Sequence, residues 1–486
     1  MPTLQAMQRK FVTNLAFLLF LNLLIKPFWI LGIDRAVQNE VGAAEYGLYA
    51  ALFNFSFLFN ILLDLGITNF NNRNIARHNH LLKKHLSGIL TLRIILAIGY
   101  SLFSIGIAFA LGYRGGELSL LFILLLNQAL LSLILYLRSN IAGLHLFRAD
   151  SIVSVLDRFI MIVMCGFLLW TDHGGGSFRI EWFALTQTIA YAITAILTYL
   201  FLKTRVTEIH LSWNPKFALV ILKKSYPFAI LILLMTFYNR IDSVMLERLR
   251  DDGAEQAGIY AQAYRLLDAA NMIAYLFSAL LLPMFSHMIR HGKSPEQLTE
   301  LAFSFIAVPA LIVMSVGTAH ADALMNLLYV HHGQEAASVF MILIHCFLSM
   351  GSVYIFGTLL TANGNLKQLN QIALGAMVLN MALNFFLIPT YGAVGAALAG
   401  LITQALAALA QMLLAHSIFA FKFRWSLAIR YLAFLATCFS VAYAGKALPQ
   451  YFLIQAVLTA LICIAIALIL RLIRPKELLQ TLRAEA

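Results

Sequence analysis

Charge is scarce in this chain, and that scarcity is the first constraint on what the protein can be. Asp, Glu, Lys and Arg make up only 12% of the 486 residues, whereas 61% are hydrophobic. A soluble chain of this length would fold into several cores, each covered by a polar and charged surface. Because so few charges cannot supply that surface, we exclude a soluble multidomain protein.

Paired cysteines and the common metal and nucleotide motifs are also lacking. The chain has no paired cysteine spacing, which argues against a disulfide framework or a cysteine metal site. The four cysteines are Cys165, Cys346, Cys438 and Cys463. His331-His332 has no third spaced ligand, and no G-x-x-x-x-G-K-[ST] sequence occurs. We therefore expect no metal, no cofactor and no ATPase of the chain's own.

Long apolar runs take the place of these features. They recur from end to end at about 20 residues each, enough to cross the roughly 30 Å hydrocarbon layer. Because open strands cannot satisfy their backbone in lipid, we predict an all-α polytopic membrane protein with about fourteen transmembrane helices. The predicted spans are 11–33, 46–66, 88–112, 118–138, 151–170, 181–202, 225–246, 258–285, 298–319, 336–360, 366–388, 392–419, 426–447 and 451–473. The first lacks a signal-peptide cleavage pattern, so we expect it to be retained.

The basic residues alternate from loop to loop. The formal net charge of +12 could indicate a nucleic-acid partner, but 22 Lys or Arg belong to the termini and even-numbered connections against 6 in the odd-numbered ones. This is the positive-inside pattern, so we predict cytoplasmic N- and C-termini, contact with anionic membrane lipids and no nucleic-acid partner. Acids of the odd-numbered loops should face outward: Asp34, Glu40, Glu45, Glu247, Asp251, Asp252 and Glu255.

A repeated segment suggests that the chain is duplicated. Residues 42–51 read GAAEYGLYAA, and 211 positions later residues 253–262 read GAEQAGIYAQ. Six predicted spans separate the copies, so both lobes should have the same orientation, as in parallel-repeat transporters. We predict a six-helix lobe over 1–202, a basic cytoplasmic linker over 203–224, a second six-helix lobe over 225–419, and two extra helices with a cytoplasmic tail over 420–486.

Nine ionisable side chains lie well within predicted spans, where each costs about 2.5–3.5 kcal/mol at the bilayer centre. Such groups should face one another or a watery cavity. Counting 1.5 Å per residue from the predicted helix ends separates two tiers. The outer tier holds Lys26, Arg240, Asp242, Arg265 and Asp268, and the cytoplasmic tier holds Asp64, Arg93, Asp157 and Arg158.

The outer tier has more cations than carboxylates. Lys26, Arg240 and Arg265 are therefore the candidate lining of a cationic cavity for an anionic ligand. Arginine suits phosphate because its planar fork donates two parallel hydrogen bonds.

The alternative is that these charges pair with each other or hold a coupling ion. Arg265 and Asp268 are spaced i, i+3 on one helix, and Asp157 can pair with Arg158 or Arg93. Arg93 can also extend to the cytoplasmic interface. The group of candidate ion sites or salt-bridge partners is Asp64, Arg93, Asp157, Arg158, Asp242 and Asp268.

Several short motifs carry a family resemblance over nearly the whole chain. They are Glu45-Tyr46-Gly47-Leu48-Tyr49, Asp64-Leu65-Gly66, Asn72-Arg73-Asn74-Ile75-Ala76-Arg77, Arg240-Ile241-Asp242, Gly258-Ile259-Tyr260-Ala261, Leu282-Pro283-Met284-Phe285-Ser286 and Gly392-Ala393-Val394-Gly395-Ala396-Ala397. In these residues the sequence resembles the polysaccharide-biosynthesis (O-antigen-type) lipid-linked oligosaccharide flippases of the multidrug/oligosaccharidyl-lipid/polysaccharide (MOP) exporter superfamily.

The resemblance implies a transporter rather than an enzyme. It implies two six-helix lobes around a cationic cavity in the bacterial cytoplasmic (inner) membrane, alternating access without ATP hydrolysis, and a polyprenyl-pyrophosphate-linked glycan as substrate. Glycan-assembly proteins would be partners. The two extra helices also resemble those of peptidoglycan lipid II flippases, where they help to form a groove for the lipid tail.

Three alternatives stay open on the sequence. The intramembrane carboxylates Asp64, Asp242 and Asp268 would suit a cation-coupled multidrug exporter, although the excess of intramembrane cations argues against cationic drugs. A peptidoglycan lipid II flippase shares the expected architecture. A membrane-embedded glycosyltransferase or polymerase fits less well, because the outward loops are short and contain no Asp-x-Asp pair.

Overall fold

A computed structural model of the chain describes residues 17, 20–22, 24–68, 82–144, 146–171, 178–204, 215–421, 424–446 and 451–472. Every regular element in this part of the chain is a helix. Ten of these helices are long and apolar enough to cross a membrane by length and composition. The predicted fold class, an all-α polytopic membrane protein, is confirmed.

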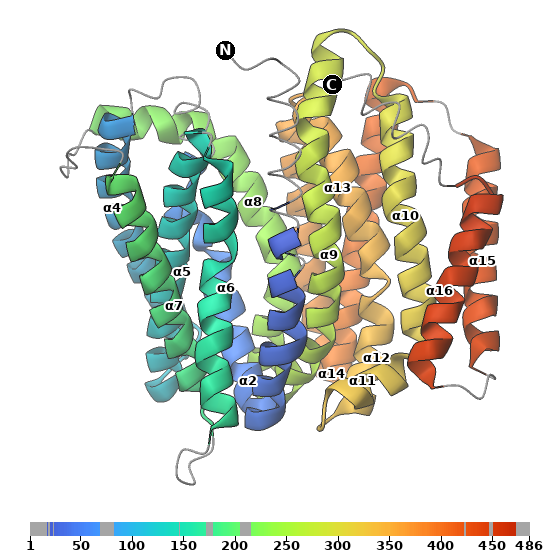
Figure 1. Ribbon diagram of the computed structural model, residues 1–486, viewed down its shortest axis with the longest axis horizontal. Coiled ribbons are helices and arrows are strands. Elements are labelled where there is room, and N and C mark those ends of the chain that lie inside the picture. Colours follow the sequence, from blue (N-terminus) through green and yellow to red (C-terminus); the bar gives the residue numbers. More distant parts are fainter. Residues whose placement is uncertain are drawn as a thin grey trace. The chain divides into compact units, whose positions relative to one another are not determined.

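The described residues divide into two compact units, Met1–Val244 and Met245–Ala486. The first contains η1 (Trp29–Asp34), α2 (Arg35–Leu58), η2 (Asn60–Leu63), α4 (Leu82–Ala110), α5 (Gly115–Gly143), α6 (Phe147–Trp170), α7 (Ile180–Lys203) and most of α8 (Pro215–Leu249). Helix α5 packs along α7, and α2 packs against both (Figure 1). A buried cluster that includes Ile89, Tyr136, Leu137 and Leu202 joins α4, α5 and α7.

The first membrane helix is longer than we predicted. It continues through η1 into α2 and ends at Gly42, whose φ of +80° suits glycine. The expected outer loop at 34–45 is therefore largely helical. The prediction that Asp34 faces outward from a loop is wrong, because this residue lies within the helix with only 2% of its surface exposed. Residues 33–41 contain neither glycine nor proline, so nothing in them ends the helix.

The second unit contains α9 (Gly253–Arg290), α10 (Glu296–Ala319), α11 (Ala321–Leu328), α12 (Gly333–Leu343), α13 (Cys346–Ala362), α14 (Leu366–Phe419), α15 (Trp425–Gly445) and α16 (Phe452–Ile469). Helix α13 packs against α9 and α14, while α15 and α16 lie side by side and pack on α10 (Figure 1). Their apolar seam includes Val308, Leu311, Phe434, Cys438 and Cys463.

Two helices of this unit depart from the predicted spans. The expected spans 366–388 and 392–419 are joined in α14, with a bend at Gly392 where φ is +55°. The expected span 336–360 is divided between α12 and α13. Residues 205–214 of the predicted linker and the Asn72–Arg77 motif lie outside the described residues. The predicted boundaries of the lobes and the linker stay predictions.

Candidate functional site

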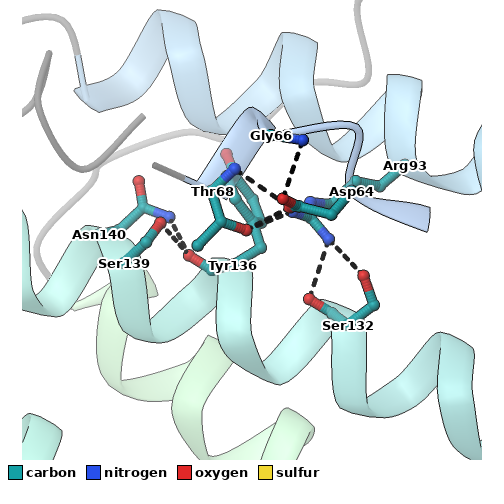
Figure 2. Close-up of polar contacts among 8 residues, drawn as sticks. All are labelled: Asp64, Gly66, Thr68, Arg93, Ser132, Tyr136, Ser139 and Asn140. Atoms are coloured by element: carbon teal, nitrogen blue, oxygen red, sulfur yellow. Dashed lines mark hydrogen bonds and ion pairs between the residues drawn. The ribbon is translucent and has the colours of Figure 1, made fainter. Parts of the chain in front are cut away.

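Asp64 and Arg93 form an extensively hydrogen-bonded charge pair in the first unit (Figure 2). Asp64 follows η2, and its carboxylate accepts the backbone N–H groups of Gly66 and Thr68, each at 3.1 Å. Nη2 of Arg93 donates to the same carboxylate. The turn positions the carboxylate locally because Leu65 and Gly66 both adopt positive φ and bring the chain back over it.

The other end of the Arg93 guanidinium reaches α5. Nη1 donates to the Ser132 hydroxyl at 2.6 Å and to the Ser132 carbonyl at 2.9 Å, and the group stacks over the Tyr136 ring at 4.8 Å. Only 5% of the Arg93 side chain is exposed. A guanidinium engaged in this way on two sides holds the η2 turn, α4 and α5 together, which is a structural role.

Lys26, Asp157 and Arg158 form a second cluster where the first helix runs beside α6. Asn22 Nδ2 donates to Ser154 Oγ at 3.2 Å across this pair, a sequence separation of 132. Lys26 and Arg158 have the same separation. Because Arg158 also acts electrostatically on Lys26, one turn after the Asn22–Ser154 contact, the two helices run parallel here and Lys26 and Arg158 lie at similar depth.

Two cations of this cluster face one carboxylate. Arg158 Nε lies 3.8 Å from Asp157 Oδ2, and its guanidinium stacks over the rings of Trp29 at 5.4 Å and Tyr191 at 5.9 Å. Lys26 is partly buried and within electrostatic range of both charges. Lys26 and Arg158 bring two positive formal charges to this cluster and Asp157 brings one negative charge. The nearby Arg138 is paired with Asp150 at 2.8 Å.

The separation of Lys26 from Asp157 and Arg158 into two tiers is therefore wrong. We counted the depth of Lys26 from the predicted cytoplasmic end of the first helix at residue 11, and we placed the outer end of that helix at 33, whereas the helix continues to Gly42. From Gly42 Lys26 lies roughly 24 Å deep, and Asp157 lies about 20 Å from the end of α6 at Trp170. The longer helix places the two residues at matching depths.

Arg240 and Asp242 lie near the end of the first unit, on α8. The Arg240 guanidinium stacks over the Phe57 ring at 5.7 Å, and Asp242 is 2% exposed. In the second unit, Arg265 Nη1 lies 4.0 Å from Asp268 Oδ2 across one turn of α9, so the predicted i, i+3 contact is present. The predicted cavity draws on Lys26 and Arg240 from one unit and Arg265 from the other, and it stays a prediction.

Asp34 is a charged group of the interior that our sequence reasoning missed. Its carboxylate accepts hydrogen bonds from the Tyr46 hydroxyl at 2.8 Å and from Gln38 Nε2 at 3.2 Å. Beside it, Gln187 Nε2 donates to the Tyr49 hydroxyl at 2.6 Å. The i, i+4 spacing of Asp34 and Gln38 on a segment without helix breakers was the available signal.

The described residues contain no group of three or more His, Cys, Asp or Glu side chains that could hold a metal ion. The described cysteines are free and buried. The first unit places fixed charge in its interior in two forms: the hydrogen-bonded Asp64–Arg93 pair and the cluster of Lys26, Asp157 and Arg158.

Comparison with solved structures defines the class of this fold. The lipid II flippase MurJ, in an inward closed conformation, matches with a TM-score of 0.68 at 15% identity over 92% of this chain and 98% of that chain. An inward-facing multidrug resistance MATE family transporter of the MOP superfamily matches with 0.65 at 13% identity over 82% and 98%. A MOP superfamily transporter from Pyrococcus furiosus matches with 0.60 at 15% identity over 84% and 95%. The chain has the fold of these multi-pass membrane transporters.

The sequence adds the family. Residues 12–289 match the profile of the family described as polysaccharide biosynthesis protein. This match covers more than half of the chain, which therefore belongs to the polysaccharide biosynthesis protein family, as the motifs predicted. No curated protein matches the sequence.

Proposed function

We propose that the protein is a flippase that moves a polyprenyl-pyrophosphate-linked oligosaccharide across the cytoplasmic membrane for O-antigen, capsule or exopolysaccharide biosynthesis. The family supports the pathway, and the fold supports transport by alternating access. The single observation that carries the proposal is the cluster of two cations, Lys26 and Arg158, with one buried carboxylate, Asp157, inside a membrane unit.

A pyrophosphate needs cations that are already fixed in place. The Arg158 guanidinium is held between Asp157 and two aromatic rings, so little side-chain freedom remains to be lost on binding. Lys26 adds a second positive charge at the same depth. In an environment of low dielectric, both charges attract an anion more strongly than they would in water. Arg240 and Arg265 would add to this attraction if they line the same pathway.

In this proposal the sugars and the pyrophosphate pass through the protein while the polyprenyl tail stays in the membrane. Both termini lie in the cytoplasm, and glycan-assembly proteins supply and consume the carrier. The protein makes or breaks no glycosidic bond. Purified protein given a lipid-linked sugar donor should therefore show transbilayer movement of the donor and no new glycosidic product.

The direct test is a pair of substitutions in the cationic cluster. Lys26→Ala with Arg158→Ala should reduce surface glycan at least tenfold and leave lipid-linked glycan on the inner leaflet, while the protein still inserts. Arg179→Ala is the matched control, because this arginine is 65% exposed and pairs with Glu181 near the surface of the chain. Normal glycan export by the double variant would contradict the proposal. Arg240→Ala with Arg265→Ala tests the predicted outer cavity in the same assay.

Asp34 favours a second candidate, cation-coupled export of drugs. A carboxylate that is buried in a membrane unit and bonded to Tyr46 and Gln38 is a candidate site for proton or Na⁺ uptake. This function predicts that cells expressing the protein gain drug resistance, that Asp34→Asn abolishes the gain, and that surface glycan does not change. A lipid II flippase would instead sustain growth of cells depleted of their own lipid II flippase.

A further inference from the structure

Two adjoining cavities lie in the second unit, and their lining residues belong to none of the charge clusters described above. The first, of about 450 Å³, lies among α10, α13, α14 and α15. The second, of about 390 Å³, lies at the beginning of α10 and extends to the residues that follow α16. They share Glu296, Glu300, Arg424 and Leu427, so the two cavities adjoin, and we call the second one the mouth. Both volumes fall in the roughly 300–1,000 Å³ range of ligand sites.

The first cavity is an apolar slot. Apolar side chains form most of its wall, among them Phe303, Leu311, Leu348, Phe356 and Leu435. Its polar lining groups bond within the protein. The Tyr431 hydroxyl donates to Ser304 Oγ at 2.8 Å, and Thr299 Oγ1 donates to the Pro295 carbonyl at 2.8 Å. The slot therefore fits a hydrocarbon chain and offers little to a polar solute.

The mouth is lined by equal numbers of positive and negative side chains. Its lining includes two guanidiniums, Arg424 and Arg471, and two carboxylates, Glu296 and Glu300. Arg424 Nη1 lies 2.9 Å from Glu300 Oε2, yet 53% of the Arg424 side chain is exposed, which leaves part of the guanidinium accessible. Arg471 adopts a left-handed φ of +54°, an uncommon conformation for a residue other than glycine.

The position of the mouth relative to the membrane follows from α15. Trp425, 73% exposed, begins this helix directly after Arg424. Exposed tryptophans at the ends of membrane helices lie at the level of the lipid headgroups. Leu432, 65% exposed, lies two turns further along and also lines the slot. The charged mouth thus lies at headgroup level and the slot at hydrocarbon level.

We propose that this site binds one phospholipid with a zwitterionic headgroup, phosphatidylethanolamine. Its phosphate would bind Arg424 and Arg471, its primary ammonium would bind Glu296 and Glu300, and one acyl chain would fill the slot. Equal numbers of guanidiniums and carboxylates favour a headgroup that carries both charges. An anionic headgroup would meet two carboxylates, and a quaternary ammonium could not donate hydrogen bonds to them. This binding does not depend on which molecule the protein transports.

Lipid binding to the purified full-length protein tests the headgroup. In native mass spectrometry from detergent, phosphatidylethanolamine should bind at one saturable site, about tenfold more tightly than phosphatidylglycerol or phosphatidylcholine of the same acyl chains. Equal binding of all three lipids, or no saturable site, would overturn the proposal.

Two substitutions test the site itself. Arg424→Gln should weaken phosphatidylethanolamine binding about tenfold, whereas Arg430→Gln, an exposed arginine of α15 outside both linings, should leave it unchanged. Ala307→Phe would fill the slot and should abolish the binding; Ala433→Phe, at an exposed position of α15, is its control.

Unchanged binding in both site variants would place the lipid elsewhere and overturn the assignment. If Ala307→Phe fails to fold, Arg424→Gln still decides, because this substitution changes a half-exposed side chain outside the core. A further outcome concerns the carrier lipid. If undecaprenyl phosphate displaces phosphatidylethanolamine and binds more tightly than it, the slot belongs to the transported lipid and the proposal fails.

Discussion

A single guanidinium, that of Arg93, connects three segments of the first unit. It bonds to the turn after η2 through Asp64 and to α5 through Ser132, while its own backbone belongs to α4. Removing one partner of a buried ion pair leaves the other charge without compensation, which costs more than the pair itself contributes. Arg158 makes a longer contact with its carboxylate partner, because its Nε lies 3.8 Å from Asp157 Oδ2. The two arginines therefore differ in role although both lie within the membrane.

We expect Arg93→Ala to lower the free energy of unfolding by about 3 kcal/mol, at the lower end of the range for breaking a buried pair because Asp64 is 27% exposed. Arg93→Lys should recover only part of this loss, since an ammonium cannot reproduce the planar set of donors that the guanidinium directs at Asp64 and Ser132. Unfolding by sodium dodecyl sulfate in mixed micelles measures the change. Arg179→Ala, at an exposed pair, should cost no more than about 0.5 kcal/mol. Equal stability of Arg93→Ala and the wild type would show that the pair is not structural.

His320 links stability to pH. It lies in the turn between α10 and α11, where burial and the charge of Lys446 lower its pKa below 6.5. The unfolded chain then binds more protons than the folded one as the pH falls through 6.5. The contribution of His320 to the free energy of unfolding is therefore fully present above pH 6.5. It declines below that pH, by at most about 1.4 kcal/mol per pH unit. Thermal unfolding in detergent between pH 8 and pH 5 should show this slope in the wild type and a shallower one in His320→Gln.

At the scale of the element, two glycines allow helices to bend where the sequence pattern predicted loops. Gly42 and Gly392 both have positive φ inside what is otherwise one continuous helix. Their surroundings differ. A Cβ at Gly42 would meet nothing within 4 Å, whereas a Cβ at Gly392 would lie 2.4 Å from Gln256 Oε1. That oxygen accepts the Ala393 N–H at 3.0 Å and so ties the bend of α14 to α9.

This pair of glycines allows backbone strain to be separated from packing. Gly42→Ala should cost about 2 kcal/mol, because its φ of +80° with ψ of 170° is a backbone conformation that is essentially restricted to glycine. Gly392→Ala should cost more, by about 1 kcal/mol or above, because Gln256 must also move away and give up its hydrogen bond. Unfolding in mixed micelles compares the two variants. We would also measure both glycine variants in a Gln256→Ala background. If their unfolding free energies still differed by the same amount there, the packing explanation would be wrong.

Helix length also explains which parts of the site the sequence could predict. Hydropathy predicted the all-helical fold because spans of about 20 apolar residues leave few alternatives in lipid. It also located the intramembrane charges, which are visible as interruptions of those spans. It could not predict that Lys26 meets Arg158, because depth depends on where a helix ends, and the first helix passes the expected end at 33 and reaches Gly42. The partners of Arg93 lie 29 and 39 residues away, and only the packing of separate helices identifies them.

At the scale of the whole molecule, orientation in the membrane joins the proposals together, because it decides from which side the cationic cluster is loaded and which leaflet supplies the phospholipid. The described cysteines are buried, so a cysteine introduced at an exposed position can be labelled selectively. Glu40 is exposed beside the Gly42 bend, and Arg424 is exposed at the mouth of the lipid site. The positive-inside pattern predicts that these two residues lie on opposite sides of the membrane.

In intact spheroplasts, a membrane-impermeant maleimide should label Glu40→Cys and should label Arg424→Cys only after permeabilisation. The reverse pattern would place the termini outside and the phospholipid in the outer leaflet, and labelling of both variants in intact spheroplasts would contradict the predicted number of crossings between them.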